Sequence, residues 1–139
     1  MSYQLVKSNP NVYKLLDALN RNASDVEMWT ACKDAERDDT LFIGLSGEGA
    51  GIYARATVAS TPTLETPDDE FWVDPAGPRK PTWMSRLATF ENFSQHPVLE
   101  RILTAIPALS RVSKLLHSQG SAYYLTDEEG RAIDSLISP

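Results

Sequence analysis

Two strand-like segments joined by a glycine-rich stretch constrain the fold of this chain more than any other feature. Residues 40–46 and 52–58 carry the apolar and β-branched side chains typical of paired strands, and Gly47-Glu48-Gly49-Ala50-Gly51 lies between them. We therefore predict a hairpin with a flexible tip, whose two strands are the core of the fold. The tip lacks the Lys-Ser/Thr of a phosphate-binding loop and the spacing of a dinucleotide fingerprint, so we interpret it as a turn whose backbone comes close to a partner.

The segments on either side of the hairpin differ in character. Residues 3–7 alternate apolar with polar side chains and predict a first strand, which Ser8-Asn9-Pro10 stops. A short helix is expected from Asn11, because apolar side chains recur at helical spacing at Val12, Leu15, Leu16 and Leu19. Residues 61–81 hold five of the nine prolines and runs of Asp and Glu, which predicts a long surface loop and not a strand.

The C-terminal half is predicted to add strands and helices. Residues 83–93 have a strand-like pattern, and residues 97–103 open a helix with Pro97 in its first turn, a helix that Pro107 ends. Residues 121–125 predict a short last strand. A capping box follows, formed by Thr126 and Glu129, and starts a closing helix that buries Ile133, Leu136 and Ile137.

This order of elements predicts one domain, residues 1–139, of the α+β class. With 139 residues, no internal repeat and strands mixed with about three helices, the expected architecture is a small, partly open mixed β-barrel with flanking helices.

Composition excludes several classes of protein. Hydrophobic residues make up 42% and charged residues 23%, as in an ordinary globular domain. The chain has neither an apolar run of roughly 20 residues nor the layout of a secretory signal, so we expect a cytoplasmic protein without a membrane partner. Cys32 is the single cysteine and there are two histidines, too few soft ligands for a zinc cluster, so no metal or other cofactor is expected.

The net charge of −6 hides an asymmetry along the chain. Residues 79–117 carry six basic and two acidic side chains, whereas residues 1–78 carry six and thirteen. A nucleic-acid backbone is bound mainly by Lys and Arg, so phosphate contacts are expected in this basic middle stretch, and a solvated basic face is an equally weighted alternative. The candidate phosphate-binding residues are Arg79, Lys80, Arg86, Arg111 and Lys114.

Signatures of catalysis are missing. Ser46 has no glycine elbow around it, and neither histidine lies in a context that indicates a base for Ser or Cys. The acidic pairs fall among loop residues, where solvent exposure is the default. We therefore predict that the domain is not an enzyme.

The three tryptophans are the more informative residues. Trp83 begins a predicted strand and is assigned to the core, whereas Trp72 lies in the proline-rich acidic loop, where a core role and a ligand role are equally weighted. Two indole rings facing each other around a slot would hold a flat base by stacking. Asn9 could offer both a donor and an acceptor to the edge of that base, and its alternative role is a turn residue or helix cap.

The order of short motifs along the chain resembles that of the YTH domain. The motifs are Tyr3-Gln4-Leu5-Val6-Lys7-Ser8-Asn9, Met28-Trp29-Thr30, Gly51-Ile52-Tyr53-Ala54 and Phe71-Trp72-Val73-Asp74-Pro75-Ala76-Gly77. Gly51-Ile52-Tyr53-Ala54, taken with Gln119-Gly120-Ser121 and the segment 125–129, is also similar to the EVE domain. Both domains belong to the PUA-like group, a small β-barrel with flanking helices, and the resemblance covers nearly the whole chain.

The resemblance implies a binding function: a flipped base carrying a modification, methylated or hydroxymethylated cytosine or adenine, is held in an aromatic cage. By YTH-like placement Asn9 contacts the base, Trp29 and Trp72 form the cage walls, and Thr30 neighbours the base. By EVE-like placement Ser46, Gly51 and Gln119 surround the same opening. Pro10 departs from the YTH pattern, since proline removes a backbone donor next to Asn9.

The resemblance also implies partners. Domains of this kind are often fused to, or associated with, the nuclease or the NTPase motor of a modification-dependent restriction system, in which they confer specificity. Modified DNA is therefore the expected ligand. Two alternatives stay open: a reader of modified RNA, and an interaction domain that binds no nucleic acid and keeps its aromatic residues in the core.

Overall fold

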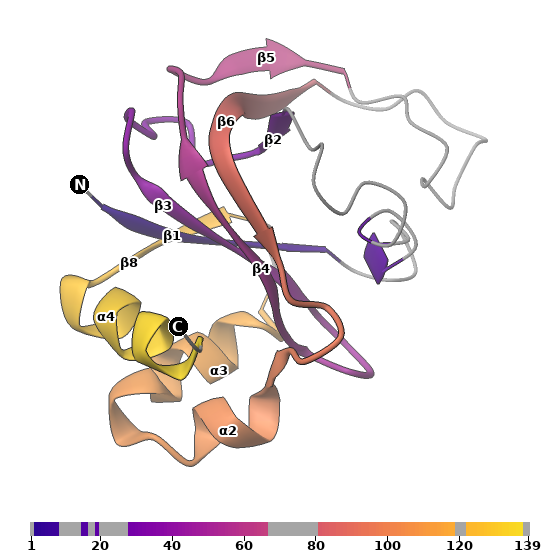
Figure 1. Cartoon of the computed structure of the whole chain (residues 1–139), viewed down its shortest axis with the longest axis vertical. Helices are drawn as coiled ribbons and strands as arrows, with labels where there is room; N and C mark the ends of the chain where they lie inside the picture. The colour runs from indigo at the N-terminus through magenta and orange to yellow at the C-terminus, as the bar shows by residue number, and fades with distance from the viewer. Residues whose placement is uncertain are drawn as a thin grey trace.

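The structure is a computed structural model that describes residues 2–8, 15–16, 19, 28–66, 81–118 and 122–137. Its strands are β1 (Tyr3–Ser8), β2 (Met28–Thr30), β3 (Thr40–Leu45), β4 (Gly51–Val58), β5 (Thr63–Glu65), β6 (Thr82–Asn92), β7 (Val98–Leu99) and β8 (Ala122–Leu125). Its helices are α2 (Glu100–Thr104), the 3-10 helix η1 (Pro107–Leu109), α3 (Ser110–Leu115) and α4 (Asp127–Leu136) (Figure 1). Leu15, Leu16 and Leu19 are also helical.

The strands form one mixed sheet that curls into a half-barrel (Figure 1). Its order is β2-β6-β4-β3-β1-β8, with β5 paired to β6 and β7 paired to β4. Strands β1 and β3 are parallel, and the other strand pairs among the described residues are antiparallel. The predicted hairpin is confirmed as the β3–β4 pair, and the predicted α+β, PUA-like architecture is confirmed by this sheet and its flanking helices.

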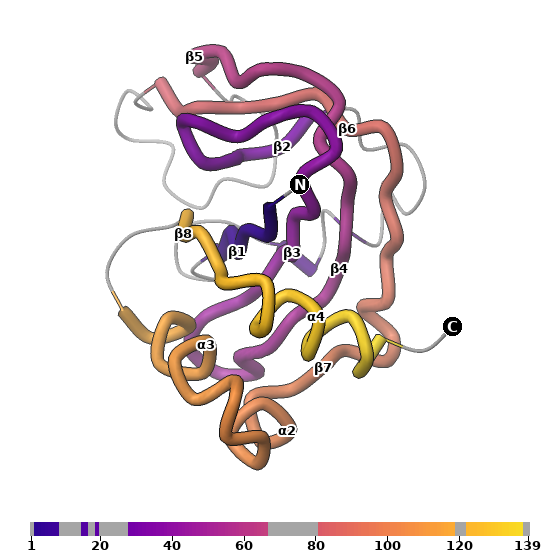
Figure 2. The backbone as a smooth tube through the Cα atoms, turned by 90° about the vertical axis from the view of Figure 1, so that its left-hand side faces the viewer, coloured from indigo at the N-terminus to yellow at the C-terminus, as the bar shows by residue number. Residues whose placement is uncertain are grey.

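The sheet is buried on both faces, which explains the uninterrupted apolar run Leu41-Phe42-Ile43. Successive side chains of a strand point to opposite faces, so Leu41 and Ile43 join one hydrophobic cluster and Phe42 joins the other. The cluster with Phe42 packs against the helices through Leu103, Leu109, Val112, Leu116 and Ile133. Figures 1 and 2 show α2, α3 and α4 gathered at the same side of the sheet.

The opposite cluster, here called the inner cluster, fills the concave side of the curled sheet. Its fully or almost fully buried members include Val6, Leu15, Leu19, Leu41, Ile43, Tyr53 and Val58, and Trp29, Leu87 and Phe90 pack against it. Strand β6 reaches this cluster along its length because its register to β4 shifts: Thr57 pairs with Thr89, but Val58 pairs with Leu87. The extra residue, Ala88, is a bulge of the kind that bends a strand and increases its twist.

A buried polar network attaches the segment after β2 to β1. Asp39 accepts hydrogen bonds from the backbone of Ser2 at 2.8 Å, from Gln4 Nε2 at 2.9 Å and from the backbone of Glu36 at 2.9 Å. The amide oxygen of Gln4 accepts from the backbone N–H of Cys32 at 3.0 Å. Because Cys32 follows β2 by two residues, this network also fixes the position of β2.

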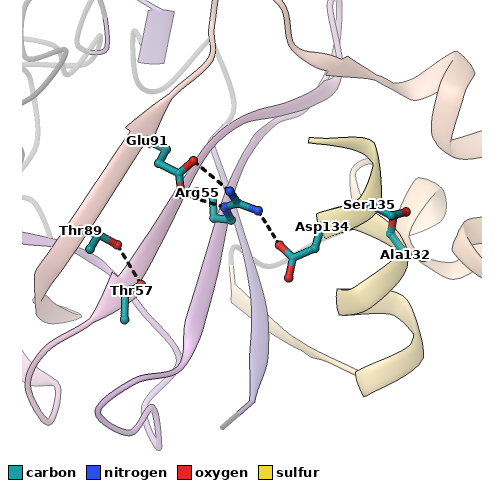
Figure 3. Close-up of polar contacts among 7 residues, drawn as sticks. All are labelled: Arg55, Thr57, Thr89, Glu91, Ala132, Asp134 and Ser135. Atoms are coloured by element: carbon teal, nitrogen blue, oxygen red, sulfur yellow. Dashed lines mark hydrogen bonds and ion pairs between the residues drawn. The ribbon is translucent and has the colours of Figure 1, made fainter. Parts of the chain in front are cut away.

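The closing helix α4 is tied to the sheet by Arg55. Its guanidinium donates to Glu91 on β6 at 2.9 and 3.1 Å and to Asp134 on α4 at 2.8 Å (Figure 3). The hydrogen bonds to Glu91 raise the pKa of Arg55, and the hydrogen bond to Asp134 raises it further. The start of α4 is the predicted capping box: the Thr126 hydroxyl accepts from the backbone of Glu129 at 3.1 Å, and the Glu129 carboxylate accepts from the backbone of Thr126 at 2.8 Å.

Three sequence predictions need correction. Residues 63–65 form strand β5, although 61–81 was predicted to contain no strand, because they pair with the first residues of β6. The predicted helix at 97–103 begins at Glu100, since Val98 and Leu99 pair with β4 instead. Of the residues assigned to the core of the closing helix, Ile133 is fully buried, whereas Leu136 and Ile137 are only partly buried. Helix α3 was not predicted.

Candidate nucleic-acid interface

Trp29 and Thr30 lie on β2, at the end of the sheet order. Strand β2 pairs with β6 so that Trp29 is opposite Ser85 and Thr30 is opposite Met84. The Trp29 ring is partly buried: it packs on the inner cluster and lies 6.4 Å from the Phe90 ring, tilted by 44°. Trp29 is therefore held by the core on an end strand of the sheet and remains partly exposed.

Ser85, opposite Trp29 on β6, is a candidate site residue that the sequence analysis did not identify. Its side chain is closed to solvent, and its hydroxyl is the one buried side-chain polar atom without a hydrogen-bond partner within the part of the chain that the structure describes. Trp83 lies two residues earlier on the same face of β6, is only partly buried, and has Lys33 Nζ 5.7 Å from its ring centroid. Trp83, which the sequence assigned to the core, therefore lies at the edge of the core.

Ser46 marks a second region, where the parallel strands β1 and β3 end side by side. The backbone N–H of Ser46 donates to the Ser8 carbonyl at 2.9 Å, and the Ser46 hydroxyl donates to the same oxygen at 3.3 Å. Ser46 is thus next to the point where the chain continues to Asn9, which lies outside the described residues.

Gly51 lies at the beginning of β4, where β7 approaches closely. A side chain at this position would place Cβ 2.5 Å from the Val98 carbonyl oxygen, so the packing of two backbones explains the glycine. The hairpin tip itself is shaped by Gly47 and Gly49, both with φ of 78°, and is fixed by the Tyr53 hydroxyl, which donates to the Gly49 carbonyl at 2.6 Å.

The register separates these two regions along β4. Gly51 is the first residue of β4, and Val58 is the last. Residues 84–86 of β6, which pair with β2, lie beyond the Val58 end of β4. Seven residue steps of a strand correspond to roughly 23 Å. The structure therefore brings Trp29 and Thr30 together with Ser85, and Ser46 together with Ser8 and the start of β4, as two groups at different ends of the strand.

Lys7 holds the end of helix α3 beside β1. This lysine is almost fully buried, and its ammonium group donates to the carbonyl oxygen of Leu115 at 2.6 Å and to that of Ser118. Burial lowers the pKa of Lys7. These bonds fix where the chain leaves toward Gln119, a predicted base contact that is outside the described range.

The predicted phosphate contacts are divided between two elements. Arg86 is exposed on β6, opposite Met28 of β2, whereas Arg111 and Lys114 are exposed on α3. Figure 1 shows β2 and β5 at one end of the molecule and α3 with the other helices at the opposite end.

Arg111 is already engaged within the protein. It donates to both carboxylate oxygens of Glu129, at 2.9 and 2.7 Å, and to the Tyr124 carbonyl at 3.0 Å. Burial alone would raise the pKa of Glu129, but the hydrogen bonds from Arg111 and Thr126 outweigh it and lower the pKa of this carboxyl.

Several of the predicted residues fall outside the part of the chain that the structure describes. They are Asn9, Trp72, Gln119, Arg79 and Lys80.

Within the described residues, the Cys32 thiol is not activated and metal-binding side chains do not cluster. Burial raises the pKa of the Cys32 thiol to about 11, so the sulfur stays protonated and weakly nucleophilic at neutral pH. Over residues 2–8, 28–66, 81–118 and 122–137, no group of three or more His, Cys, Asp or Glu side chains is placed to hold a metal ion. Over the same ranges, no helix is long and apolar enough to cross a membrane.

Solved structures with the same fold come from bacteria, protists and humans. A protein of Leishmania major superposes with a TM-score of 0.67 at 16% identity, over 98% of this chain and 94% of that one. The ASCH protein of Zymomonas mobilis gives 0.64 at 13% identity, over 99% and 100%. Human THYN1, crystallised with DNA that contains 5-methylcytosine, gives 0.58 at 16% identity, over 98% and 97%.

No protein-family model and no curated protein matches this chain. The likeness to the solved structures nevertheless extends over almost the whole chain and over almost the whole of each match. This chain therefore has the fold of THYN1 and of the ASCH protein, a PUA-like mixed sheet with flanking helices.

Proposed function

We propose that this domain binds nucleic acid that carries a modified base and holds the flipped base against the indole ring of Trp29. The observation that carries the proposal is the position of Trp29: a partly exposed tryptophan, fixed by the inner cluster, on the β2–β6 pair of a fold that THYN1 uses in a complex with 5-methylcytosine DNA. Thr30, next to Trp29, remains a predicted base contact, as do Asn9, Trp72 and Gln119, which lie outside the described residues. Ser46 and Gly51, at the other end of β4, would contact the nucleic acid away from this base.

Stacking supplies the affinity that such a site needs. Extruding a base from a duplex costs a few kcal/mol, and stacking on an aromatic side chain returns about 1–3 kcal/mol. A methyl group on the base adds apolar contact with the same ring, which favours the modified base over the unmodified one. The exposed Arg86, on the strand that pairs with β2, would bind a flanking phosphate, and Lys114 on α3 would bind only a more distant part of the backbone; such contacts make the affinity depend on salt.

In this proposal the domain selects the nucleic acid and does not itself catalyse a reaction. Among the described residues, the Cys32 thiol is buried and protonated, and the Glu129 carboxylate is engaged in the helix cap and an ion pair, which supports a binding role. Cleavage or strand translocation would belong to a fused or associated nuclease or NTPase motor, as in a modification-dependent restriction system. In such an arrangement this domain selects the DNA on which the partner acts.

A binding experiment tests the proposal. Fluorescence anisotropy is measured with labelled duplexes that carry one 5-methylcytosine, 5-hydroxymethylcytosine, N6-methyladenine or no modification, and with the same strands as single-stranded DNA and RNA, at two salt concentrations. We expect one modified duplex to bind more tightly than its unmodified counterpart. Tighter binding of the RNA would identify an RNA reader, and equal binding of all oligonucleotides would refute the proposed function.

Two substitutions at Trp29 locate the site. Trp29→Leu keeps an apolar side chain on the inner cluster and removes the flat ring, and Trp29→Ala removes both. Each should weaken binding of the modified duplex by about 1–3 kcal/mol, roughly 5-fold to 150-fold, and abolish the preference. Tyr124→Ala is the matched control, since it removes a 43% exposed aromatic ring from β8. Preference retained in both folded Trp29 variants would place the base elsewhere.

A further inference from the structure

We propose that the Ser85 hydroxyl determines specificity at this site by forming a hydrogen bond with the polar edge of the base that stacks on Trp29. The inference rests on the proposed function and adds a residue that the sequence motifs do not include. Trp29 would bind the face of the base, and Ser85 would bind its edge.

The strand register places both side chains on one face of the sheet. Trp29 and Ser85 are direct partners in the antiparallel β2–β6 pair, and directly opposed residues have Cβ atoms about 4.5–5.5 Å apart on the same face. Leu87, two residues beyond Ser85 on β6, packs on the inner cluster together with Trp29. The Ser85 side chain therefore points to the concave side of the sheet, beside the indole ring.

The unpaired hydroxyl distinguishes Ser85 from the other buried polar residues. Gln4, Asp39 and Glu129 are equally buried, and each forms at least two hydrogen bonds. Lys7 donates to two carbonyl groups. In the folded protein these groups all have hydrogen-bond partners, whereas Ser85 Oγ has none. An alanine at this position would fill almost the same volume without burying an unpaired oxygen. The hydroxyl contributes nothing visible to the folded state, which points to a role in binding.

A serine hydroxyl suits the edge of a nucleobase. It donates one hydrogen bond and accepts up to two, so it can pair with a ring nitrogen, a carbonyl oxygen or an exocyclic amino group. Because Oγ is closed to solvent in the free protein, the base must move the side chains that cover it. A base that cannot form a hydrogen bond with Oγ would displace the same side chains and still leave the hydroxyl unpaired. It would therefore bind more weakly, so one buried polar group discriminates against the wrong ligand.

The test separates a binding role of the hydroxyl from a structural one. Ser85→Ala is compared with the unmutated chain in two measurements: affinity for the 5-methylcytosine duplex and its unmodified counterpart, and urea unfolding without DNA. Thr89→Val is the matched control, because it removes a hydroxyl from the same strand on the outer face, where Thr89 bonds Thr57 at 2.8 Å (Figure 3).

We expect Ser85→Ala to bind the 5-methylcytosine duplex about 5-fold to 10-fold more weakly, with an unfolding midpoint equal to or higher than that of the unmutated chain. Thr89→Val should bind normally. The inference is overturned if Ser85→Ala keeps full affinity while the unmutated chain prefers the modified duplex, or if Ser85→Ala lowers stability, which would show a structural hydrogen bond. Equal binding of all the modified and unmodified oligonucleotides, DNA and RNA, by the unmutated chain would refute the proposed function and this inference together.

Discussion

Replacing Gly130 by alanine tests how α4 is seated on the sheet. Gly130 lies in the first half of this helix, and a Cβ built there would be 2.0–2.4 Å from three ring carbons of Tyr3. The Tyr3 ring has little freedom to move away, because it stacks on the fully buried Phe42, with ring centroids 6.0 Å apart and an interplanar angle of 2°. The added methyl group must therefore lift α4 off the sheet or break the stack.

Two opposing terms set the magnitude. Alanine is favoured over glycine inside a helix by about 1 kcal/mol. Inserting a methyl group into packed surroundings costs about 1–3 kcal/mol and more where neighbours cannot shift, and a contact near 2 Å belongs to the upper end. We expect Gly130→Ala to lower the free energy of unfolding by about 1–2 kcal/mol. Were Tyr3 absent, the same substitution should instead stabilise the domain by about 0.5–1 kcal/mol.

The assay is a double-mutant cycle. Urea unfolding is followed by tryptophan fluorescence for the unmutated chain, Gly130→Ala, Tyr3→Ala and the double variant, and a reversal of sign in the Tyr3→Ala background is the expected result. A destabilisation of the same size in both backgrounds would show that the methyl group does not meet Tyr3. A stabilising Gly130→Ala in the intact chain would refute the close packing of α4.

Two further predictions concern stability. Arg111→Ala should lower the free energy of unfolding by about 1–2 kcal/mol at neutral pH, because it removes the partner that holds down the pKa of Glu129 in the folded state. The contribution of this pair is complete above about pH 4.3 and is lost as pH falls through the lowered pKa. In urea unfolding from about pH 7 to pH 2, the stability of the variant should therefore converge on that of the unmutated chain. A constant difference across that range would contradict the ion pair. Gly51→Ala should lower stability by about 1–3 kcal/mol in the absence of nucleic acid, since Cβ would meet the Val98 carbonyl; an unchanged unfolding midpoint would argue against this packing.

The elements that could be predicted from sequence are those whose signal is local. The hairpin of β3 and β4 follows from two apolar segments around a glycine-rich turn, and the start of α4 follows from Thr126 and Glu129 at capping-box spacing. Strands β5 and β7 could not be predicted, because three or two residues carry no periodicity and pair only when β6 and β4 offer an edge. Pro97 favours a helix start, but pairing of Val98 with Ile52 delays the helix.

The candidate site could be predicted from the sequence only in part. Trp29 became a candidate because Met28-Trp29-Thr30 resembles a motif of the YTH domain, and the structure places it on an end strand of the sheet, partly exposed. Ser85 carries no such signal, since serine is common on strands and at surfaces. Only its pairing with Trp29 and its unbonded hydroxyl distinguish it, and both depend on contacts distant in sequence.

The position of β1 between β3 and β8 has a consequence for how the domain is made. One side of β1 pairs with residues 40–45, but the other pairs with residues 122–125, so Tyr3 faces both Thr40 and Leu125. A chain growing on the ribosome can form the first ladder early, whereas the second must wait until residues 122–125 emerge. Until then the unpaired edge of β1 is a template for other strands, and chaperone capture or aggregation during synthesis should depend on how quickly this last ladder closes.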